Sequence, residues 1–183
     1  FKSFPDRAIN AGIAEQNMAG MAAGMALAGK HVFTYSIGNF PTFRCAEQLR
    51  NDVDYHNLSV TTVAVGGGVS YGALGYSHHT IQDFGLMRLL PNTVILAPCD
   101  PNEVIGCLKY ISSHPQPSYL RLGKAGEKNF TNINSLLPGK VNKISAKNQK
   151  KILLTTGTAI QNLPDKYLQN VDIYSVPIWG QNV

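Results

Sequence analysis

Short apolar segments alternate with helical segments over the first 125 residues, and this alternation constrains the fold more than any other feature of the sequence. The segments with the β-branched and aromatic composition of strands are residues 31–36, 58–65, 93–97 and 118–122. Helical patterns precede or separate them, at residues 10–28, 41–52, 81–90 and 100–112. Strands joined through helices of this length pair in parallel. The sequence therefore predicts an α/β fold with a mostly parallel sheet and helices on both faces.

Two of the predicted helices have clear end signals. Gly29 follows the Gly-, Ala- and Met-rich residues 10–28 and is expected to end that helix, because glycine adopts the left-handed conformation of a C-cap without strain. Asp100, Pro101 and Glu103 have the pattern of an N-cap, a first-turn proline and a capping box. A helix is therefore predicted to begin directly after Asp100.

The composition of the chain changes after residue 125. Residues 126–150 are polar and rich in Asn and Lys, which is typical of a surface linker. Residues 151–156 and 171–176 then have the pattern of two strands flanking a short helix. Because the chain begins without Met and ends soon afterwards, we expect residues 1–125 to be an N-terminally incomplete domain. We expect residues 151–183 to be the incomplete beginning of a second α/β domain.

The formal net charge of +5 raises the question of an anionic polymer as partner. The first 123 residues carry equal numbers of basic and acidic side chains, whereas residues 124–183 carry eight lysines against three acids. This surplus is entirely lysine and has no aromatic interleaving, so it is typical of a solvated linker rather than of a nucleic-acid groove. We therefore expect no nucleic-acid partner.

The sequence indicates neither membrane anchoring nor disulfide bonding. No stretch approaches the ~20 consecutive apolar residues of a membrane span, so we expect no membrane association. The three cysteines, Cys45, Cys99 and Cys107, form no C-x-x-C pair and leave an odd count. This usage is typical of reduced thiols, and we expect a cytoplasmic protein.

The glycine-rich segment 66–75 lacks the spacing of a phosphate-binding loop. Gly67 and Gly72 are separated as in a P-loop, but Ala and Leu follow where Lys and Ser or Thr are needed to contact the phosphates. An NTPase is therefore not expected, and the glycines are expected to permit unusual dihedral angles or the close approach of a ligand or chain. His78 and His79 are adjacent and cannot share a helix face as zinc ligands do, so no metal site is predicted on this chain.

Glu15 lies near the start of an otherwise apolar helical segment and is the only acidic residue between Asp6 and Glu47. One interpretation is a carboxylate that the helix N-terminus stabilises. The other is a carboxylate whose pKa is raised by apolar surroundings, so that it can exchange a proton with a ligand. The residue pattern by itself leaves both interpretations open.

A series of motifs resembles, in order, the transketolase family of thiamine-diphosphate enzymes. Residues 4–17, with the sequence FPDRAINAGIAEQN, are similar to the glutamate motif of that family. The later motifs are Tyr35-Ser36, Asn39-Phe40-Pro41-Thr42-Phe43, Arg50-Asn51-Asp52-Val53, Ser77-His78-His79, residues 87–92 and residues 98–103. The resemblance covers roughly residues 4–125 and continues more weakly from residue 151. It implies that residues 1–125 form a pyrimidine-binding domain, which holds the aminopyrimidine end of thiamine diphosphate.

The resemblance also implies roles for particular side chains. Glu15 is implied to hydrogen-bond ring nitrogen N1′ of the aminopyrimidine and to share a proton with it, with a pKa lifted toward neutrality by a partly apolar pocket. Phe40 and Phe43 are the implied aromatic contacts of the pyrimidine, with Phe40 as the preferred stacking partner. His78 is implied to be catalytic, close to the 4′-amino group and the substrate carbonyl.

Two further residues are weaker expectations for substrate binding. His79 stands where many relatives carry Gln. Lys124 lies near the place of a family arginine that contacts the substrate phosphate, but a lysine lacks the bidentate fork of an arginine. A surface lysine without a role is an equally good interpretation of Lys124.

The resemblance implies partners as well. In the family, the diphosphate and its Mg²⁺ (or Ca²⁺) are held by a separate domain, whose metal-binding motif does not occur in this sequence. The chain therefore resembles the C-terminal subunit of a split transketolase, inactive without a companion diphosphate-binding subunit or domain. A homodimer through the pyrimidine domain is also implied, and Gly20 and Gly24 would let another backbone approach closely. The implied reaction transfers a two-carbon ketol unit between sugar phosphates.

Departures from the family pattern leave the substrate open. Family transketolases carry a histidine near the position of Gly66 and an aspartate near that of Leu74, both contacting the sugar. A different ketose, a dephosphorylated one or a different acceptor is therefore expected. A deoxyxylulose-phosphate synthase is the alternative enzyme, although its aromatic segment fits only with a shift. A non-catalytic pairing module of the same fold is the alternative outside catalysis, and the intact Glu15 and His78 speak against it.

Overall fold

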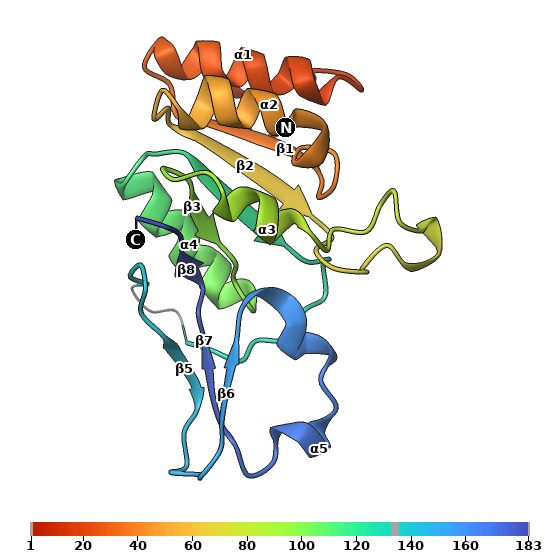
Figure 1. Ribbon diagram of the computed structural model, residues 1–183, viewed down its shortest axis with the longest axis vertical. Helices are drawn as coiled ribbons and strands as arrows, with labels where there is room; N and C mark the ends of the chain where they lie inside the picture. Colours follow the sequence, from red (N-terminus) through yellow and green to blue (C-terminus); the bar gives the residue numbers. More distant parts are fainter. Residues whose placement is uncertain (1, 133–135, 183) are drawn as a thin grey trace.

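Two β-sheets follow one another along the long axis of the molecule (Figure 1). The computed structural model describes residues 2–132 and 136–182 of the 183 residues. The larger sheet has the order β1-β2-β4-β3-β8 and is parallel except for β8, which runs antiparallel to β3. Its strands are β1 (Val32–Ile37), β2 (Val60–Val65), β3 (Val94–Leu96), β4 (Ser118–Leu122) and β8 (Ile178–Trp179). The prediction of a mostly parallel sheet is confirmed.

Helical segments precede or connect the parallel strands. Before β1 lie η1 (Pro5–Arg7) and α1 (Glu15–Leu27), and between β1 and β2 lie η2 (Phe43–Cys45), α2 (Ala46–Gln48) and the π-helical segment η3 (Leu49–Asp54). Between β2 and β3 lie η4 (Gly72–Leu74) and α3 (Asp83–Arg88), and between β3 and β4 lies α4 (Pro101–Ser113). Each connection therefore crosses over the sheet, as parallel pairing requires.

Helices cover both faces of the larger sheet, as the sequence predicts. On one face, alanines of α1 and Met87 of α3 pack with Val60, Ile95 and Tyr119 of the strands. On the other face, α4 packs its own apolar residues against the sheet, in a cluster whose buried members are Val63, Val94, Leu96, Cys107, Ile111, Leu120, Leu136 and Ile178. Successive residues of a strand point to opposite faces, which is why β3 and β4 contribute to both clusters.

Two predicted helix ends are confirmed, the C-terminal end at Gly29 and the N-terminal end at Asp100. Gly29 follows α1 with φ +82°, the left-handed conformation expected of a C-cap glycine. Asp100 Oδ1 accepts a hydrogen bond from the Glu103 backbone N–H at 2.8 Å, as an N-cap does. The reciprocal bond of the capping box is shifted by one residue, because the Glu103 carboxylate accepts from the Cys99 backbone N–H at 2.8 Å.

Residues 10–14 are the main error in the predicted helices, because α1 begins only at Glu15. Gly12 has φ +73°, which no residue of a right-handed helix adopts, and Ala14 occupies the N-cap position. Glu15 is therefore the first residue of α1, with its carboxylate beside the unpaired N–H groups of the first turn.

The smaller sheet contains a strand that lies within the predicted linker. Its order is β5-β7-β6, with strands β5 (Asn142–Ser145), β6 (Ile152–Thr155) and β7 (Asp172–Ser175). The last two strands were predicted, as was a helical connection, which consists of η5 (Gly157–Asn162) and α5 (Asp165–Leu168). After β7 the chain returns to the larger sheet as β8.

A buried polar network joins the two sheets at the start of α4. Glu103 accepts hydrogen bonds from the Asn142 side chain at 2.8 Å and from the Ser175 hydroxyl at 2.9 Å, both in the smaller sheet. Asp100 accepts from the Thr131 backbone N–H and hydroxyl. Because both carboxylates are about 1% exposed, these bonds compensate the cost of burying them.

Candidate active site

The segments that follow β1, β2 and β4 meet at one edge of the larger sheet. The three strands end in register, with Ile37 beside Val65 and Val65 beside Leu122. Residues 38–45, residues 66–80 and Lys124 therefore leave the sheet side by side. The carboxyl ends of parallel strands are the usual place of ligand sites in open α/β sheets.

Glu15 approaches this edge from the first turn of α1. Glu15 is 8% exposed, and its Oε2 lies 2.7 Å from Nη1 of Arg44. Arg44 belongs to η2, the helical segment after β1. The Arg44 side chain is nearly half exposed, so the ion pair lies at the rim of the site rather than in the core. Sequence reasoning missed Arg44.

The expectation of a raised pKa for Glu15 is wrong. Burial of the carboxylate, the largest single influence, does raise its pKa. The hydrogen bond from its own backbone N–H, the ion pair with Arg44 and the Ser36 hydroxyl together outweigh burial, so the pKa of Glu15 lies below its ordinary value. Of the two interpretations left open by the sequence, the carboxylate stabilised at the helix start agrees with the structure.

Phe40 lies between Arg44 and His78. The Arg44 guanidinium is 4.5 Å from the centroid of the Phe40 ring, and the ring centroids of Phe40 and His78 are 5.2 Å apart in an edge-to-face arrangement. Glu15, Arg44, Phe40 and His78 thus form one continuous series of contacts. The structure brings together three of the predicted site residues, and an arginine that was not predicted joins them.

His78 lies on a loop that returns to its starting point. Gly68 and Thr80 exchange two backbone hydrogen bonds of 2.7 and 2.8 Å, which close the loop at its base (Figure 1, at the right). Within the loop, the His78 Nδ1 is 3.0 Å from the Ser77 hydroxyl. The predicted glycine-rich segment therefore serves to present His78 at the sheet edge, and Gly68, Gly72 and Gly75 all have positive φ.

Tyr71 connects His78 to Lys124. Its ring centroid is 6.3 Å from that of His78, and the Lys124 ammonium lies 4.5 Å from the Tyr71 centroid. A Cβ at Gly66 would lie 2.1 Å from the Tyr71 ring, so Tyr71 fills the space into which a side chain at position 66 would extend. Sequence reasoning named Lys124 and Gly66 but missed Tyr71.

Phe43 and His79 do not join this series of contacts. Phe43 is 47% exposed, and among the described residues it makes no recorded aromatic contact. The His79 Nε2 is 2.9 Å from the Gly72 carbonyl, within the loop itself. The preference for Phe40 over Phe43 stays a prediction, but only Phe40 has a defined place between Glu15 and His78.

The side chains around Glu15 fit one end of a flat heteroaromatic molecule. A buried carboxylate can accept a hydrogen bond from a protonated ring nitrogen, an aromatic ring can stack on it, and an imidazole can contact an exocyclic group. In the described ranges, no three His, Cys, Asp or Glu side chains are grouped so as to hold a metal ion. No described helix is long and apolar enough to cross a membrane.

Three comparisons with known proteins agree with this geometry. A family model described as transketolase, pyrimidine-binding domain, matches residues 1–126. An apulose-4-phosphate transketolase subunit of Actinobacillus succinogenes is 38% identical over 165 residues, which are 90% of this chain and 53% of that protein. A 1-deoxy-D-xylulose-5-phosphate synthase of Vibrio parahaemolyticus is 35% identical over 169 residues, covering 88% of this chain and 26% of that protein.

A solved structure agrees in fold over nearly the whole chain. A split-gene transketolase, described as an inactive β4 tetramer, superimposes with a TM-score of 0.80 and 30% identity. The superposition covers 95% of this chain and 58% of that structure. The chain thus spans about half the length of the transketolase subunits that it matches.

Proposed function

The chain belongs to the transketolase family, and we propose that it is the pyrimidine-binding part of a thiamine-diphosphate-dependent enzyme that transfers a two-carbon ketol unit between sugar phosphates. The observation that carries this proposal is the contact series Glu15, Arg44, Phe40 and His78 at the carboxyl edge of the sheet. A family model that matches residues 1–126 supports it.

Glu15 would hold the aminopyrimidine through its carboxylate. With a pKa below its ordinary value, Glu15 is ionised at neutral pH and accepts a hydrogen bond from a protonated N1′. An ionised carboxylate in a nearly buried position stabilises the proton on that nitrogen. Glu15 thus acts by retaining a proton on the ring rather than by carrying one itself.

Phe40 and His78 would orient the ring and the substrate. Phe40 offers an aromatic face in a position fixed by Arg44 and His78, and stacking of this kind contributes ~0.5–1.5 kcal/mol beyond burial. His78 would contact the 4′-amino group and the substrate carbonyl. Thiamine diphosphate, when bound, supplies the electron sink for breaking the carbon–carbon bond next to a carbonyl.

The substrate phosphate would lie near Lys124. The Lys124 ammonium sits over the Tyr71 ring just after β4, and Tyr71 in turn neighbours His78. A lysine contributes a point charge without the fork of an arginine, so we propose a phosphate contact of lower geometric specificity. His79, whose ring faces the Gly72 carbonyl, is the weaker proposal for substrate contact.

A companion subunit would supply the rest of the site. We propose that it binds the diphosphate and its Mg²⁺ or Ca²⁺, and that the present chain by itself is inactive. The solved relative described as an inactive β4 tetramer supports the proposal that two subunits share the site.

A cytoplasmic location is proposed as well. The three cysteines are buried free thiols, which supports it.

A homodimer through the pyrimidine-binding domain is proposed as well. The surface of α1 supports it, because nothing lies within 4 Å of a Cβ placed at Gly20 or Gly24, and Met21 between them is 40% exposed. Ile13, just before α1, is 95% exposed. An apolar helix surface of this kind is commonly buried against another chain.

Reconstitution tests the proposed function. The chain alone should show no ketol transfer with thiamine diphosphate and Mg²⁺, and mixing it with the diphosphate-binding subunit should produce turnover. Apulose 4-phosphate and D-fructose 6-phosphate serve as donors, with D-ribose 5-phosphate as the acceptor. Turnover by the chain alone would refute the division between two subunits.

Two alternatives predict distinct outcomes for the same reconstituted protein. When pyruvate, which loses CO₂ and supplies an acetyl unit, and D-glyceraldehyde 3-phosphate replace the sugar phosphates, formation of 1-deoxy-D-xylulose 5-phosphate would favour the synthase class, to which a relative 35% identical over 169 residues belongs. Absence of cofactor binding by calorimetry, even with the companion present, would favour a non-catalytic pairing module. The intact contacts of Glu15 and His78 favour the transketolase reaction over the pairing module.

A further inference from the structure

The loop that carries His78 has little packing of its own. Between its closing residues, Gly68 and Thr80, the large apolar side chains Val69, Leu74 and Tyr76 are all more than half exposed. The two backbone hydrogen bonds at the base fix the ends of the loop, and a turn in which the His78 N–H donates to the Gly75 carbonyl at 3.0 Å sets the local shape around His78, but neither ties that turn to the rest of the site. A catalytic side chain must be held to within about 0.5 Å of its productive position, so other contacts are needed.

Two side chains from outside the loop donate hydrogen bonds to carbonyl groups on either side of His78. Asn39 Nδ2 donates to the Ser77 carbonyl at 2.9 Å, one residue before His78. Arg121 Nη2 donates to the Thr80 carbonyl, two residues after it. Asn39 follows β1 and Arg121 lies in β4, so the two donors approach the loop from different strands.

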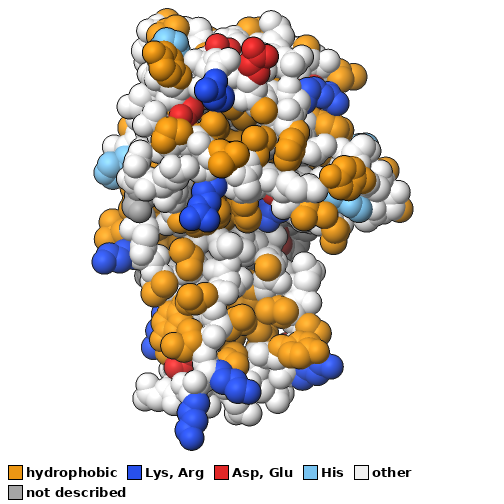
Figure 2. Space-filling model, viewed as in Figure 1, with side chains coloured by type: hydrophobic (Ala, Val, Ile, Leu, Met, Phe, Trp, Pro, Cys, Tyr) orange, Lys and Arg blue, Asp and Glu red, His pale blue; other side chains and the backbone are white. Residues whose placement is uncertain are grey.

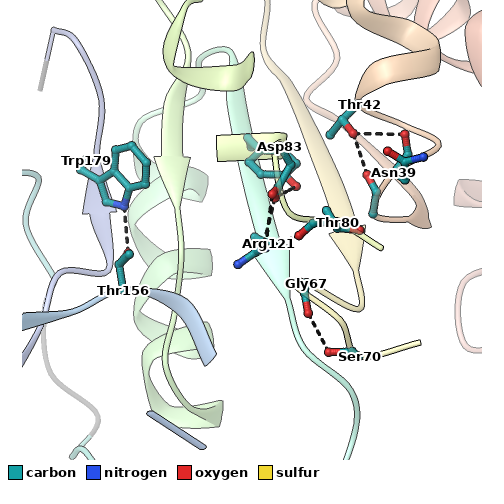
Figure 3. A network of polar contacts seen from close by, with 11 residues as sticks. Asn39, Thr42, Gly67, Ser70, Thr80, Asp83, Arg121, Thr156 and Trp179 are labelled. Carbon is teal, nitrogen blue, oxygen red and sulfur yellow. Dashed lines mark hydrogen bonds and ion pairs between the residues drawn. The ribbon is translucent and has the colours of Figure 1, made fainter. Parts of the chain in front are cut away.

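Both donors are themselves fixed. The Thr42 hydroxyl donates to the Gly38 and Asn39 carbonyls at 2.8 and 3.2 Å, which holds the turn that carries Asn39 (Figure 3). Arg121 Nε lies 2.9 Å from the fully buried Asp83 carboxylate. Figure 3 shows Arg121 between Asp83 and the loop residues Gly67 and Thr80.

The guanidinium of Arg121 is also enclosed by its neighbours. It lies 4.2 Å from the centroid of the Phe84 ring, and a Cβ at Gly67 would lie 2.6 Å from its Nε. The Tyr119 hydroxyl donates at 2.6 Å to Asp83 Oδ2, the same carboxylate oxygen that lies beside Arg121 Nε. In this setting Arg121 Nη2 is directed at the base of the loop, where it donates to the Thr80 carbonyl.

We propose that Asn39 and Arg121 are positioning residues for His78, which hold the main chain on both sides of it through the Ser77 and Thr80 carbonyls. This assignment rests on the role proposed above for His78. A displacement of about 1 Å in a reacting group can cost on the order of 10²-fold in rate, so loss of either donor should be visible in catalysis.

The experiment measures kcat and KM in the enzyme assembled from the full chain and its diphosphate-binding companion, with the ketose donor that gives turnover in the reconstitution assay. The variants are Asn39→Ala, which lies at a partly exposed site, and Arg121→Lys, which keeps the charge beside Asp83 but loses the fork. Ser70→Ala is the matched control, because Ser70 also donates to a main-chain carbonyl of this segment, that of Gly67 at 2.7 Å, but not to a carbonyl next to His78. Thermal unfolding of each variant reports its folding.

Asn39→Ala and Arg121→Lys should each lower kcat/KM by about 10- to 100-fold, with the loss mainly in kcat. Ser70→Ala should change it by less than about threefold. In a His78→Ala background, adding Asn39→Ala should lower kcat/KM by less than about a further twofold, because a residue that acts through His78 has nothing left to position.

Two results would overturn this assignment. One is an equal loss from Asn39→Ala in the wild-type and His78→Ala backgrounds, which would indicate a role independent of His78. The other is wild-type activity of Asn39→Ala and Arg121→Lys while His78→Ala is impaired. Wild-type activity of His78→Ala itself would instead refute the role proposed for His78, so the two failures are distinguishable.

Discussion

Glu15 has polar partners from two directions, and both favour its charged form. Its own backbone N–H lies at the start of α1, and Arg44 reaches it from the segment after β1. Burial works against the charge but is outweighed, so Glu15 is a carboxylate over the whole neutral range. A glutamate poised near neutrality would leave part of the population uncharged and so less able to stabilise a proton on N1′.

Replacing Arg44 tests which contact sets the charge of Glu15. In the wild-type chain the carboxyl group should titrate below the ordinary value of 4.5, and in Arg44→Met its pKa should rise because burial then has less opposition. The stability that Glu15 contributes is present above pH 4.5 and is lost as the pH falls through its lowered pKa. Carbon-13 chemical shifts of the glutamate Cδ, followed with pH, measure both values.

Lys2→Met is the control for that titration, because Lys2 is an exposed cation for which no contact with Glu15 is recorded. Its substitution should leave the pKa of Glu15 unchanged. An unchanged Glu15 pKa in Arg44→Met would mean that the backbone N–H and the Ser36 hydroxyl hold the carboxylate ionised without Arg44.

The site residues that could be predicted from the sequence are those that lie within a recognisable motif. Glu15, Phe40 and His78 lie in segments that resemble family motifs, and the structure places them in one contact series. Arg44 and Tyr71 lie near these motifs, but their importance comes from ring and ion-pair contacts with side chains of other segments. No local pattern records such a pairing.

Among the elements, α4 depends most on a single side chain. Asp100 caps its first turn and also accepts hydrogen bonds from the backbone N–H groups of Phe130 and Thr131. The same carboxylate thus fixes both the start of a helix and the chain that leads away from the larger sheet. Removal of an N-cap costs about 0.5–2 kcal/mol, and each buried donor left unpaired costs about 1–3 kcal/mol more.

Asp100→Ala should therefore lower the free energy of unfolding by at least about 2 kcal/mol, measured by urea denaturation. Asp165→Ala is the control, because Asp165 also stands in the first turn of a helix, α5, but is exposed. It should change stability by no more than about 0.5 kcal/mol. Equal effects of the two substitutions would contradict the capping role of Asp100.

The elements that sequence reasoning missed are those with weak local signals. Strand β5 lies in a polar, Lys-rich segment, and β8 has only two residues. Both exist because of tertiary pairing, β5 with β7 and β8 with β3. The late start of α1 has a local cause instead, because the Gly12 N–H donates to Asn10 Oδ1 at 2.9 Å and Gly12 has φ +73°, outside the helical region.

At the scale of the whole molecule, the lysines that make up the charge surplus lie away from the proposed site, with the exception of Lys124. Lys and Arg side chains border the lower end of the molecule, over the smaller sheet, whereas acidic and basic groups are mixed at the upper end (Figure 2). The larger sheet carries Glu15, His78 and the segments that present them. The net charge of +5 therefore describes the second part of the chain more than the part that would bind a cofactor.

The substitution Glu15→Gln, in the enzyme assembled with its companion subunit, tests the central claim most directly. The amide keeps the shape of the side chain but removes the charge that stabilises a proton on N1′, so ketol transfer should fall by about 10²–10⁴-fold. Glu47→Gln, at a glutamate on α2 outside the contact series of the site, should leave the rate unchanged. Full activity of Glu15→Gln would contradict the account.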